Sequence, residues 1–420
     1  MMANTKRLLA GFTLVALVTA AGISPRILGR AAAAQGSSGV MYPTFQLDTT
    51  YPPKLPNDMV FGNVSKVVVD RQDHVWVIHR PRTVPKDKKS APPVVELDAN
   101  GKYVQGWGGP GAGYDWPDAE HNIFVDHNDN VWISGSSPSG QSVTRDSDDM
   151  LLKFTRQGKL VKQFAGRSVN LGSKDPNSVN KPGDLFVYAK TNEVFVADGY
   201  GNRRAIVFDA STIAFKRMWG AFGNTPQDEP GESGGRGGTG GPLPVPNAGG
   251  GRGGRGAAPA LDTEGPGPLQ FGDPVHSIAV SNDDLVYVGD RGSRRFQVFN
   301  LKGNYIAQMF INRAGPSGDS VCGFAFSPDP DQQFLYVADY GNSRIVVVDR
   351  KKLQVLYQFG KRGAEPGNFQ GVHMIATDSK HNLYAAEVAP GARLQKFTFK
   401  GMSATLPPNA LTAAELAAKP

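Results

Sequence analysis

Three of the chain's seven histidines share one spacing along the sequence. His121, His276 and His373 each stand 11 residues before an aromatic residue that lies inside a short apolar run. Those aromatic residues are Trp132, Tyr287 and Tyr384. An equal distance from a common landmark predicts an equal place in the fold. Three imidazoles that meet at one point leave a fourth direction open, which is the ligand set of a catalytic zinc ion.

The other four histidines carry no such signal. His74, His127 and His381 lie in polar turns, where solvent and turn chemistry explain them, and we assign them no function. His79 ends a strand next to Arg80, and its role stays open between structure and function. Taken singly, each of the three equally spaced histidines is also explained as a satisfied core or turn residue. Their shared spacing is what favours a metal site.

The aromatic landmarks belong to a repeat that runs through most of the chain. Short β-rich runs centred on an aromatic recur six times, as in HVWVIHR, EVFVADGYGNRR and FLYVADYGNSR. An apolar run and a polar turn precede each of them, and most are followed by two further short strands. Four strands per repeat are typical of a propeller blade, so the sequence predicts an all-β, six-bladed β-propeller. The six anchors are Trp76, Trp132, Phe195, Tyr287, Tyr336 and Tyr384.

The propeller explains how the three histidines can meet. They fall at the start of the innermost strand in the second, fourth and sixth blades, and alternate blades of a six-bladed ring point inward about 120° apart. Ser65 and Asp184 are the predicted equivalents in the first and third blades, so histidine is not a feature of every repeat.

Residues just after the second strand of a blade are expected on the same face as the histidines, because that strand returns to the face where the first begins. Arg80, Tyr200 and Arg291 are the candidate catalytic residues on this argument, with Tyr340 at the matching position of the fifth blade. The Tyr200 hairpin is one residue longer, and the extra Gly199 is expected to re-aim the tyrosine. The repeat's own arginines are interpreted as structural: Arg204, Arg295 and Arg344.

Segments outside the repeat are predicted from their composition. With 51 Gly and 31 Pro among 420 residues, a helical bundle is excluded. Residues 226–267 are Gly/Pro/Arg-rich and lack apolar periodicity, so they are interpreted as a disordered insertion. The alternative is an RNA-binding segment, but the five acidic residues of this stretch outnumber its three arginines and argue against it. The propeller is expected over 43–401, where the strand at 43–48 completes the last blade, and 402–420 form a C-terminal tail.

The first 34 residues are typical of a secretory leader. Lys6 and Arg7 precede an apolar stretch, and alanines at 31–34 offer a cleavage site, so we expect an exported, periplasmic or secreted protein without a membrane anchor after cleavage. Without the leader, the formal charge falls from +7 to +3, too little to argue for a nucleic-acid partner. The single cysteine, Cys322, excludes an intramolecular disulfide and is expected to be a buried small hydrophobe. We expect a monomer.

The pattern VAD-x-x-N-x-R-I resembles NHL repeats, and residues 62–400 resemble peptidylamidoglycolate lyase, the lyase domain of peptidylglycine amidation. The resemblance rests on VWVIHR, GRSVNLGS with VFVADGYGNRR, PVHSIAV with VYVGDR, and GVHMIA. It implies a six-bladed propeller with a zinc held by His121, His276 and His373. It also implies that Tyr200 acts as base, and that Arg80 and Arg291 bind or polarise the substrate.

Two residues depart from that family. Gly201 stands where the family has a disulfide-bonded cysteine after the tyrosine, so that disulfide is absent. Met374 stands where an aspartate after the third histidine binds a structural Ca²⁺, which argues against that ion, although Val67 and Ile123 still offer backbone carbonyls.

Three functions follow as hypotheses. The first is a zinc-dependent carbon–nitrogen lyase that converts a peptidyl-α-hydroxyglycine-like carbinolamide, a small-molecule or peptide substrate, into an amide and glyoxylate. The second is a non-catalytic NHL propeller that binds a protein or glycan partner through its channel face. The third is a calcium-dependent lactonase-like propeller, which requires axial Glu, Asp and Asn, and the three histidines argue against it.

Overall fold

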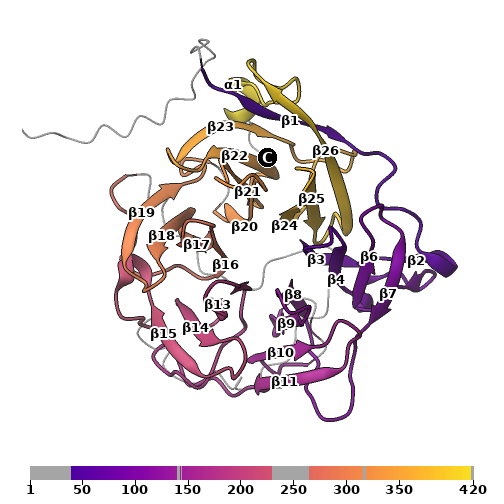
Figure 1. Cartoon of the computed structure of the whole chain (residues 1–420), viewed down its shortest axis with the longest axis vertical. Coiled ribbons are helices and arrows are strands. Elements are labelled where there is room, and N and C mark those ends of the chain that lie inside the picture. Colours follow the sequence, from indigo (N-terminus) through magenta and orange to yellow (C-terminus); the bar gives the residue numbers. More distant parts are fainter. Residues whose placement is uncertain (1–38, 140–141, 143, 229–263, 316–317, 418–420) are drawn as a thin grey trace, which may run out of the picture. The chain divides into compact units, whose positions relative to one another are not determined.

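Short apolar runs bounded by polar turns form the strands of this chain, and the described residues arrange them as six four-stranded antiparallel sheets around a central axis (Figure 1). The predicted six-bladed β-propeller is therefore confirmed. The computed structural model describes residues 39–139, 142, 144–228, 264–315 and 318–417. The predicted leader, residues 1–34, lies outside the described residues, as do residues 229–263 of the predicted insertion.

The first three blades follow one another along the chain, each beginning with its innermost strand. Blade 1 contains β3 (Asn63–Val69), β4 (Val75–Arg80), β6 (Val94–Leu97) and β7 (Tyr103–Trp107). Blade 2 contains β8 (Glu120–Val125), β9 (Val131–Gly135), β10 (Met150–Phe154) and β11 (Leu160–Ala165). Blade 3 contains β12 (Asp184–Tyr188), β13 (Glu193–Asp198), β14 (Arg204–Asp209) and β15 (Phe215–Trp219).

The last three blades repeat the pattern, with one exchange of strands at the end. Blade 4 contains β16 (Val275–Val280), β17 (Leu285–Asp290), β18 (Arg295–Asn300) and β19 (Tyr305–Phe310). Blade 5 contains β20 (Val321–Phe326), β21 (Phe334–Asp339), β22 (Arg344–Asp349) and β23 (Gln354–Phe359). Blade 6 contains β24 (Val372–Thr377), β25 (Leu383–Glu387), β26 (Arg393–Ser403) and, from the other end of the chain, β1 (Tyr42–Leu47).

The pairing of β1 with β26 closes the ring. It is antiparallel and joins Leu47 to Phe397 and Tyr42 to Ser403. This is the closure expected from the strand at 43–48, and it gives the last blade its fourth, outermost strand. A small parallel pair, β2 (Met59–Val60) with β5 (Lys89–Ser90), lies beside blade 1.

Three of the six anchor aromatics hold the turn between the first and second strands of their blade. Trp76 donates its indole N–H to Asp70 at 2.9 Å, and the same carboxylate accepts the backbone N–H groups of Gln72 and His74. Trp132 with Asp126 and Tyr384 with Asp378 repeat this contact in blades 2 and 6. His74, His127 and His381 belong to these turns, which gives the turn histidines a structural context.

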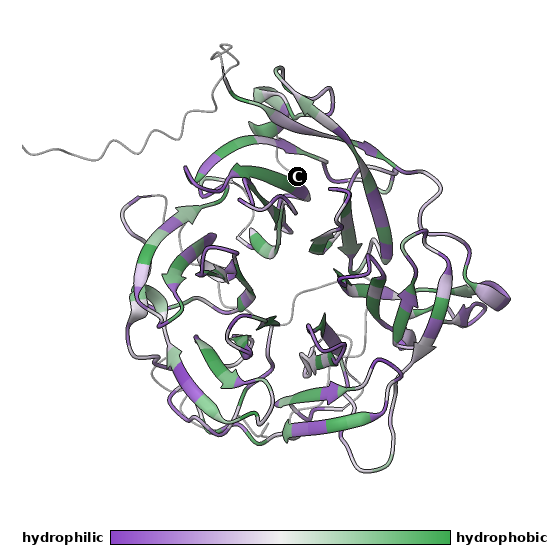
Figure 2. Ribbon diagram, viewed as in Figure 1, coloured by the Kyte–Doolittle hydropathy of each residue, from purple (hydrophilic) through white to green (hydrophobic). Residues whose placement is uncertain are grey.

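Hydrophobic residues pack mainly between neighbouring blades. Trp76 and Ile78 of blade 1, for example, share a buried cluster with Ile123 and Ile133 of blade 2. Figure 2 shows hydrophobic residues in the strands of every blade, with polar residues among them and in the connecting loops. Burial of side chains of this size stabilises the fold by roughly 1.5–3 kcal/mol each, so adjacent blades hold one another in register around the axis.

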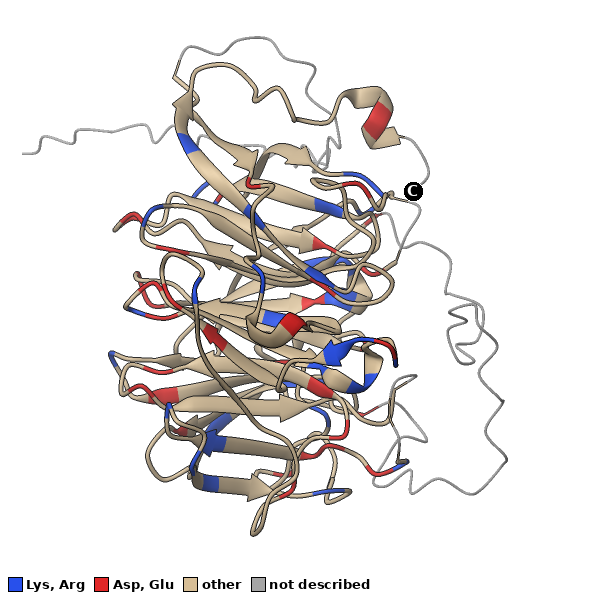
Figure 3. Ribbon diagram, turned by 90° about the vertical axis from the view of Figure 1, so that its right-hand side faces the viewer, with Lys and Arg blue, Asp and Glu red and all other residues tan. Residues whose placement is uncertain are grey.

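Arginines anchor the loops that lead into the innermost strands, as the structural interpretation of Arg204 and Arg295 requires. Buried Arg204 pairs with Asp198 at 2.8 Å and donates to the carbonyls of Ser173, Asp175 and Ser178. Arg295 does the same in blade 4 with Asp290 and the carbonyls of Pro266, Pro268 and Gln270. Figure 3 shows acidic and basic residues interspersed along loops and strand ends.

Helices are short in the described part of the chain. There are four single-turn 3₁₀ segments, η1 (Pro56–Asp58), η2 (Pro81–Thr83), η3 (Ala221–Gly223) and η4 (Arg291–Ser293), and one α-helix, α1 (Ala413–Ala417). None of these helices has the length and apolar character needed to cross a membrane. The segment predicted as a tail contributes to the fold, because β26 continues to Ser403 and Arg344 donates to the carbonyls of Glu415 and Leu416.

Candidate metal centre

One residue near the start of each innermost strand stands out of register with the neighbouring strand. In five blades the pairing shifts across that residue, as in a β-bulge. In blade 3 the equivalent residue immediately precedes β12, and its N–H donates to the Ala197 carbonyl. In blade order these residues are Ser65, His121, Gly183, His276, Cys322 and His373.

The three histidines of this ring converge. Their ring centroids lie 4.8–5.2 Å apart, and one ligand nitrogen from each lies within 4.8 Å of the others. All three side chains are buried, with at most 4% of their surface exposed. The structure therefore brings together the three histidines that the sequence singled out.

The residues between the histidines orient them. Nδ1 of His276 donates to the Cys322 carbonyl and Nδ1 of His373 to the Ser65 carbonyl, both at 2.6 Å. His121 faces the backbone of Gly183, but its Nδ1 completes no hydrogen bond among the described residues. Each histidine thus faces the ring residue of the next blade. Donation from Nδ1 leaves the lone pair on Nε2, which is the form that binds a metal.

Tyr200 reaches into the centre of this cluster. Its hydroxyl oxygen lies 2.9 Å from Nε2 of His276 and 3.1 Å from Nε2 of His121. A phenol carries only one proton, so it can donate to only one of these two acceptor nitrogens. A cation accepts lone pairs from all three histidines at once. The donor set therefore fits a metal ion with three nitrogen ligands and a further position open.

Two arginines flank the tyrosine. Arg291, at the start of η4, donates from Nη1 to the Tyr200 hydroxyl at 3.3 Å, lies 3.6 Å from Asp319, and stacks 4.7 Å from the ring centroid of Tyr340. Its Nε is buried and has no acceptor among the described residues. Arg80, the last residue of β4, is held by the Glu120 carbonyl at 3.0 Å.

Burial controls the protonation of the cluster. It lowers the pKa of His121 and His276 well below the usual histidine value and that of His373 to about 3, so all three are neutral at pH 7. Burial also raises the pKa of Tyr200, while Arg291 and Arg80 lower it. In the structure without a metal, burial outweighs them.

The glycine before Tyr200 fixes where the tyrosine hairpin lies. A β-carbon on Gly199 would stand 2.0 Å from the Val275 carbonyl oxygen, so only glycine allows this approach to the residue before His276. Tyr340, in the shorter hairpin, has its ring 6.4 Å from that of His373, and no hydrogen bond of its hydroxyl to the histidines is found among the described residues. The longer hairpin therefore places the Tyr200 hydroxyl between the histidines, whereas Tyr340, in the shorter hairpin, lies beside the cluster.

The register expected for the odd blades needs one correction. Counting 11 residues back from the anchor indicates Asp184 in blade 3, but the structure places Gly183 at the ring position and Asp184 one residue further along. The reason is hairpin length: Phe186 pairs with Phe195, one position more than in the histidine blades, where Phe124 pairs with Trp132. In blade 5 a longer hairpin places Cys322 in the ring, where it is fully buried as expected.

Sequence reasoning missed Lys66, which follows Ser65 on β3. Its ammonium group is buried and bonds to Asn122 and Asp184. The available signal was a lysine in the apolar run NVSKVVV, where a charge needs a buried partner.

The structural Ca²⁺ implied by the resemblance does not fit these residues. Met374 is buried and offers a thioether in place of a carboxylate, and Ca²⁺ requires oxygen ligands. A second group with metal-ligand residue types, Asp70, His74 and Glu96, already contains the guanidinium of Arg156, which lies 2.9 Å from Asp70 and 3.0 Å from His74 Nδ1. That group is an ion-pair cluster.

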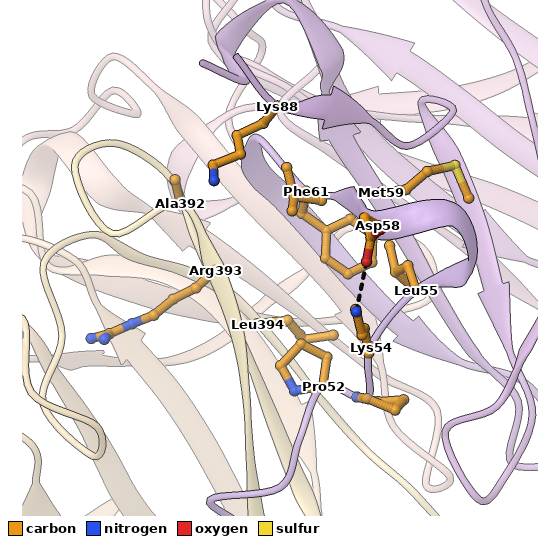
Figure 4. A pocket seen from close by; sticks show the side chains of 12 residues that line it. Pro52, Lys54, Leu55, Asp58, Met59, Phe61, Lys88, Ala392, Arg393 and Leu394 are labelled. Atoms are coloured by element: carbon orange, nitrogen blue, oxygen red, sulfur yellow. Dashed lines mark ion pairs between the residues drawn. The ribbon is translucent and has the colours of Figure 1, made fainter. Parts of the chain in front are cut away.

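A cavity of about 600 Å³ lies between the loops of blades 1 and 6 (Figure 4). Apolar side chains such as Leu55, Met59 and Phe61 line much of it, and its one carboxylate, Asp58, is paired with Lys54 at 2.6 Å. It shares no residue with the histidine cluster and offers no metal-ligand set. The histidine cluster is therefore the stronger candidate for chemistry.

Comparisons with known proteins agree with the fold. No protein-family model matches the chain. It is 24% identical over 314 residues to mouse NHL repeat-containing protein 3, which covers 73% of this chain and 70% of that protein. The human protein of the same name is 24% identical over 312 residues, covering 72% of this chain and 69% of that protein. The fold is a six-bladed β-propeller, and the chain is similar over most of its length to NHL repeat-containing proteins.

A shorter similarity connects the chain to an enzyme. It is 26% identical over 174 residues to rat peptidylglycine alpha-amidating monooxygenase, which corresponds to 40% of this chain and 16% of that protein. Mouse peptidyl-glycine alpha-amidating monooxygenase gives the same identity and coverage. The chain is thus similar to a small part of each amidating enzyme.

Proposed function

We propose that this chain is a zinc-dependent carbon–nitrogen lyase that cleaves peptidyl-α-hydroxyglycine-like carbinolamides into an amide and glyoxylate. The observation that supports it best is the Tyr200 hydroxyl, which lies within hydrogen-bond distance of Nε2 of both His121 and His276 at the point where three histidines meet. A proton acceptor and a set of metal ligands therefore share one centre. The similarity to the amidating enzymes supports the same chemistry.

His121, His276 and His373 would hold the zinc, which would supply Lewis acidity toward an oxygen of the substrate. As the phenolate, a form that a bound zinc ion and the nearby arginines would favour, Tyr200 would take the proton of the substrate hydroxyl. The C–N bond then breaks: its electron pair stays on the amide nitrogen, which receives a proton, and the carbinol carbon becomes the aldehyde of glyoxylate. Tyr200 is placed to return that proton, so the reaction needs no other reagent.

The arginines would bind the substrate carboxylate through charge-assisted hydrogen bonds. Arg291 is suited to this task because its buried Nε lacks an acceptor among the described residues and its Nη1 already touches Tyr200. Arg80 extends toward the same centre from the adjacent side, held by the carbonyl of Glu120. A carboxylate between them would satisfy the orphan donor.

Metal analysis and turnover test the proposal together. The protein is purified without chelators, its metal content is measured by elemental analysis, and glyoxylate release from α-hydroxyhippurate is followed on the same sample. About one zinc per chain with glyoxylate release supports the proposal. A zinc-replete protein that releases no glyoxylate from α-hydroxyglycine substrates would refute the lyase activity.

A second candidate is a non-catalytic propeller that binds a protein or glycan partner through its channel face. The observation in its favour is the extent of the similarity: the match to NHL repeat-containing protein 3 covers 73% of this chain, whereas the match to the amidating enzyme covers 40% of it. Absence of bound zinc after gentle purification would support this candidate. We also propose export directed by residues 1–34 and a monomeric state, which N-terminal sequencing of the secreted protein and size-exclusion chromatography test.

A further inference from the structure

Three polar side chains from three blades meet one residue beyond the histidine ring. Nζ of Lys66 in β3 donates to Oδ1 of Asn122 in β8 at 2.7 Å and to Oδ1 of Asp184 in β12. All three are buried, with exposed fractions of 6%, 0% and 5%. The ammonium group therefore links blades 1, 2 and 3 close to the axis.

Each of the three residues directly follows a member of the ring. Lys66 follows Ser65, Asn122 follows His121, and Asp184 follows Gly183. The carbonyl of Ser65 accepts the Nδ1 proton of His373. The hydroxyl of Ser65 donates to the Glu120 carbonyl at 2.7 Å, next to His121. Lys66 thus holds the side chain of the residue after His121, while its chain neighbour Ser65 contacts the residue before His121 and accepts from His373.

Stability alone does not account for a buried ion pair at this place. Apolar side chains of similar volume often stabilise a protein as well or better, because burying two charges is costly. The ring contains apolar neighbours at the matching positions of blades 5 and 6, Gly323 and Met374, so the fold tolerates such residues here. What the ion pair adds is directed hydrogen bonds between blades.

We propose that Lys66 is a positioning residue of the metal centre. It clamps blades 1, 2 and 3 so that His121 and His373 are held in the orientation that a shared metal ion needs. The inference rests on the metal site of the proposed function and goes beyond it by assigning a role to a residue that touches neither metal nor substrate.

The direction in which zinc affinity changes when Lys66 is replaced distinguishes a positioning role from a purely electrostatic effect of its charge. Removing a positive charge near a cation site would strengthen metal binding if charge were all that mattered. Loss of positioning weakens it, and removal of residues that orient metal ligands typically costs 10–100-fold in affinity. We therefore expect Lys66→Met to bind Zn²⁺ 10–100-fold more weakly than the unchanged chain, measured by competition with a chromophoric chelator on the full-length apoprotein.

Lys66→Met leaves the Asp184 carboxylate buried without its cation, so this variant alone could fail to fold. A second variant is therefore needed. The double variant Lys66→Met/Asp184→Asn removes both charges, keeps the net charge of the pair, and is expected to fold and still bind Zn²⁺ at least tenfold more weakly. Co²⁺ absorption of the same variants reports the ligand geometry and should change in shape.

Lys153→Met is the matched control, because Lys153 is also buried and donates to the Ala210 carbonyl at 2.9 Å from the third strand of blade 2. It should lose stability without losing zinc affinity. Unchanged or tighter zinc binding in the folded Lys66 variants would overturn the proposal. Zinc affinity is measured without turnover, so an inactive chain whose variants bind zinc weakly would refute the lyase activity and leave this inference standing.

Discussion

The backbone of Gly199 lies directly against the backbone of Val275. A β-carbon on Gly199 would stand 2.0 Å from the Val275 carbonyl oxygen and 2.3 Å from its nitrogen, distances that no side chain can occupy. Gly199 precedes Tyr200 and Val275 precedes His276, so this contact sets the distance between the tyrosine and one of the metal ligands.

We expect Gly199→Ala to separate the Tyr200 hairpin from blade 4. Overpacking of this kind costs roughly 1–3 kcal/mol of stability, and displacement of the Tyr200 hydroxyl should lower kcat by at least about tenfold, since misplacement of about 1 Å is enough for such losses. Thermal unfolding and glyoxylate release measure the two effects. Gly318→Ala is the control, because its nearest neighbouring atom lies 3.7 Å away. Equal activity of the two variants would contradict this account.

Tyr200→Phe removes the hydroxyl and keeps the ring. Zinc content should be unchanged, because the three histidines remain, and turnover should fall by roughly 10²–10⁴-fold, the range for lost acid–base catalysis. Tyr340→Phe is the matched control: its ring still stacks on Arg291, and we expect little change in turnover. Full activity of a zinc-replete Tyr200→Phe protein would remove the tyrosine from the mechanism.

Replacement of His121, His276 or His373 by Ala should strip the metal, because two remaining ligands form a poor site. Elemental analysis after dialysis measures this loss. The turn histidines His74, His127 and His381 provide three controls whose replacement by Ala should leave metal content unchanged. A turn variant that loses metal as readily as a ring variant would show that the ligands are assigned wrongly.

The pH dependence of stability should carry the signature of His79. This buried side chain accepts the Gly62 N–H at Nδ1 and contacts the Pro92 carbonyl at Nε2, and burial lowers its pKa to about 4. The unfolded chain binds a proton near the ordinary pKa of about 6.5. The contribution of His79 to the free energy of unfolding is therefore fully present above pH 6.5. It decreases by about 3 kcal/mol as the pH falls toward 4.

Denaturant unfolding of the metal-free protein at several pH values measures that slope. His79→Gln, which can replace both hydrogen bonds without titrating, should make the decline between pH 6.5 and 4 smaller by about 3 kcal/mol, while the ring histidines, whose pKa values burial also lowers, maintain the rest of it. His127→Gln, in an outer turn, should leave it unchanged. A His79→Gln protein whose stability declines with pH as steeply as the unchanged chain would refute the assignment.

The sequence predicts the fold and the ring histidines because both depend on local patterns. The anchor aromatics mark each second strand, and the hairpins of the three histidine blades have equal lengths, so counting back from the anchor finds the right residue. The same count fails in blade 3, where one additional residue replaces Asp184 by Gly183, and in blade 5, where three additional residues place Cys322 in the ring. Hairpin length varies without changing the apolar pattern that defines the strands.

Contacts between blades are harder to predict, because they join residues far apart in the chain. Lys66 and Asp184 are separated by 118 positions, and neither residue type nor spacing indicates that they pair. The protonation of Tyr200 is likewise a property of the assembled centre: the sequence indicates two nearby arginines, but the degree of burial that opposes them follows from packing.

The closure of the ring by β1 has a consequence for biosynthesis. Translation makes β1 first and its partner β26 last, so the nascent chain carries the edge of β1 unpaired until the sixth blade has been synthesised. His373 lies in that last blade, and its Nδ1 bonds to Ser65 in the first, across the junction that β1 and β26 complete. The three ligands and the closing strand are therefore present together only once the sixth blade has been synthesised, and a chain terminated before β24 would carry neither a closed ring nor a third ligand.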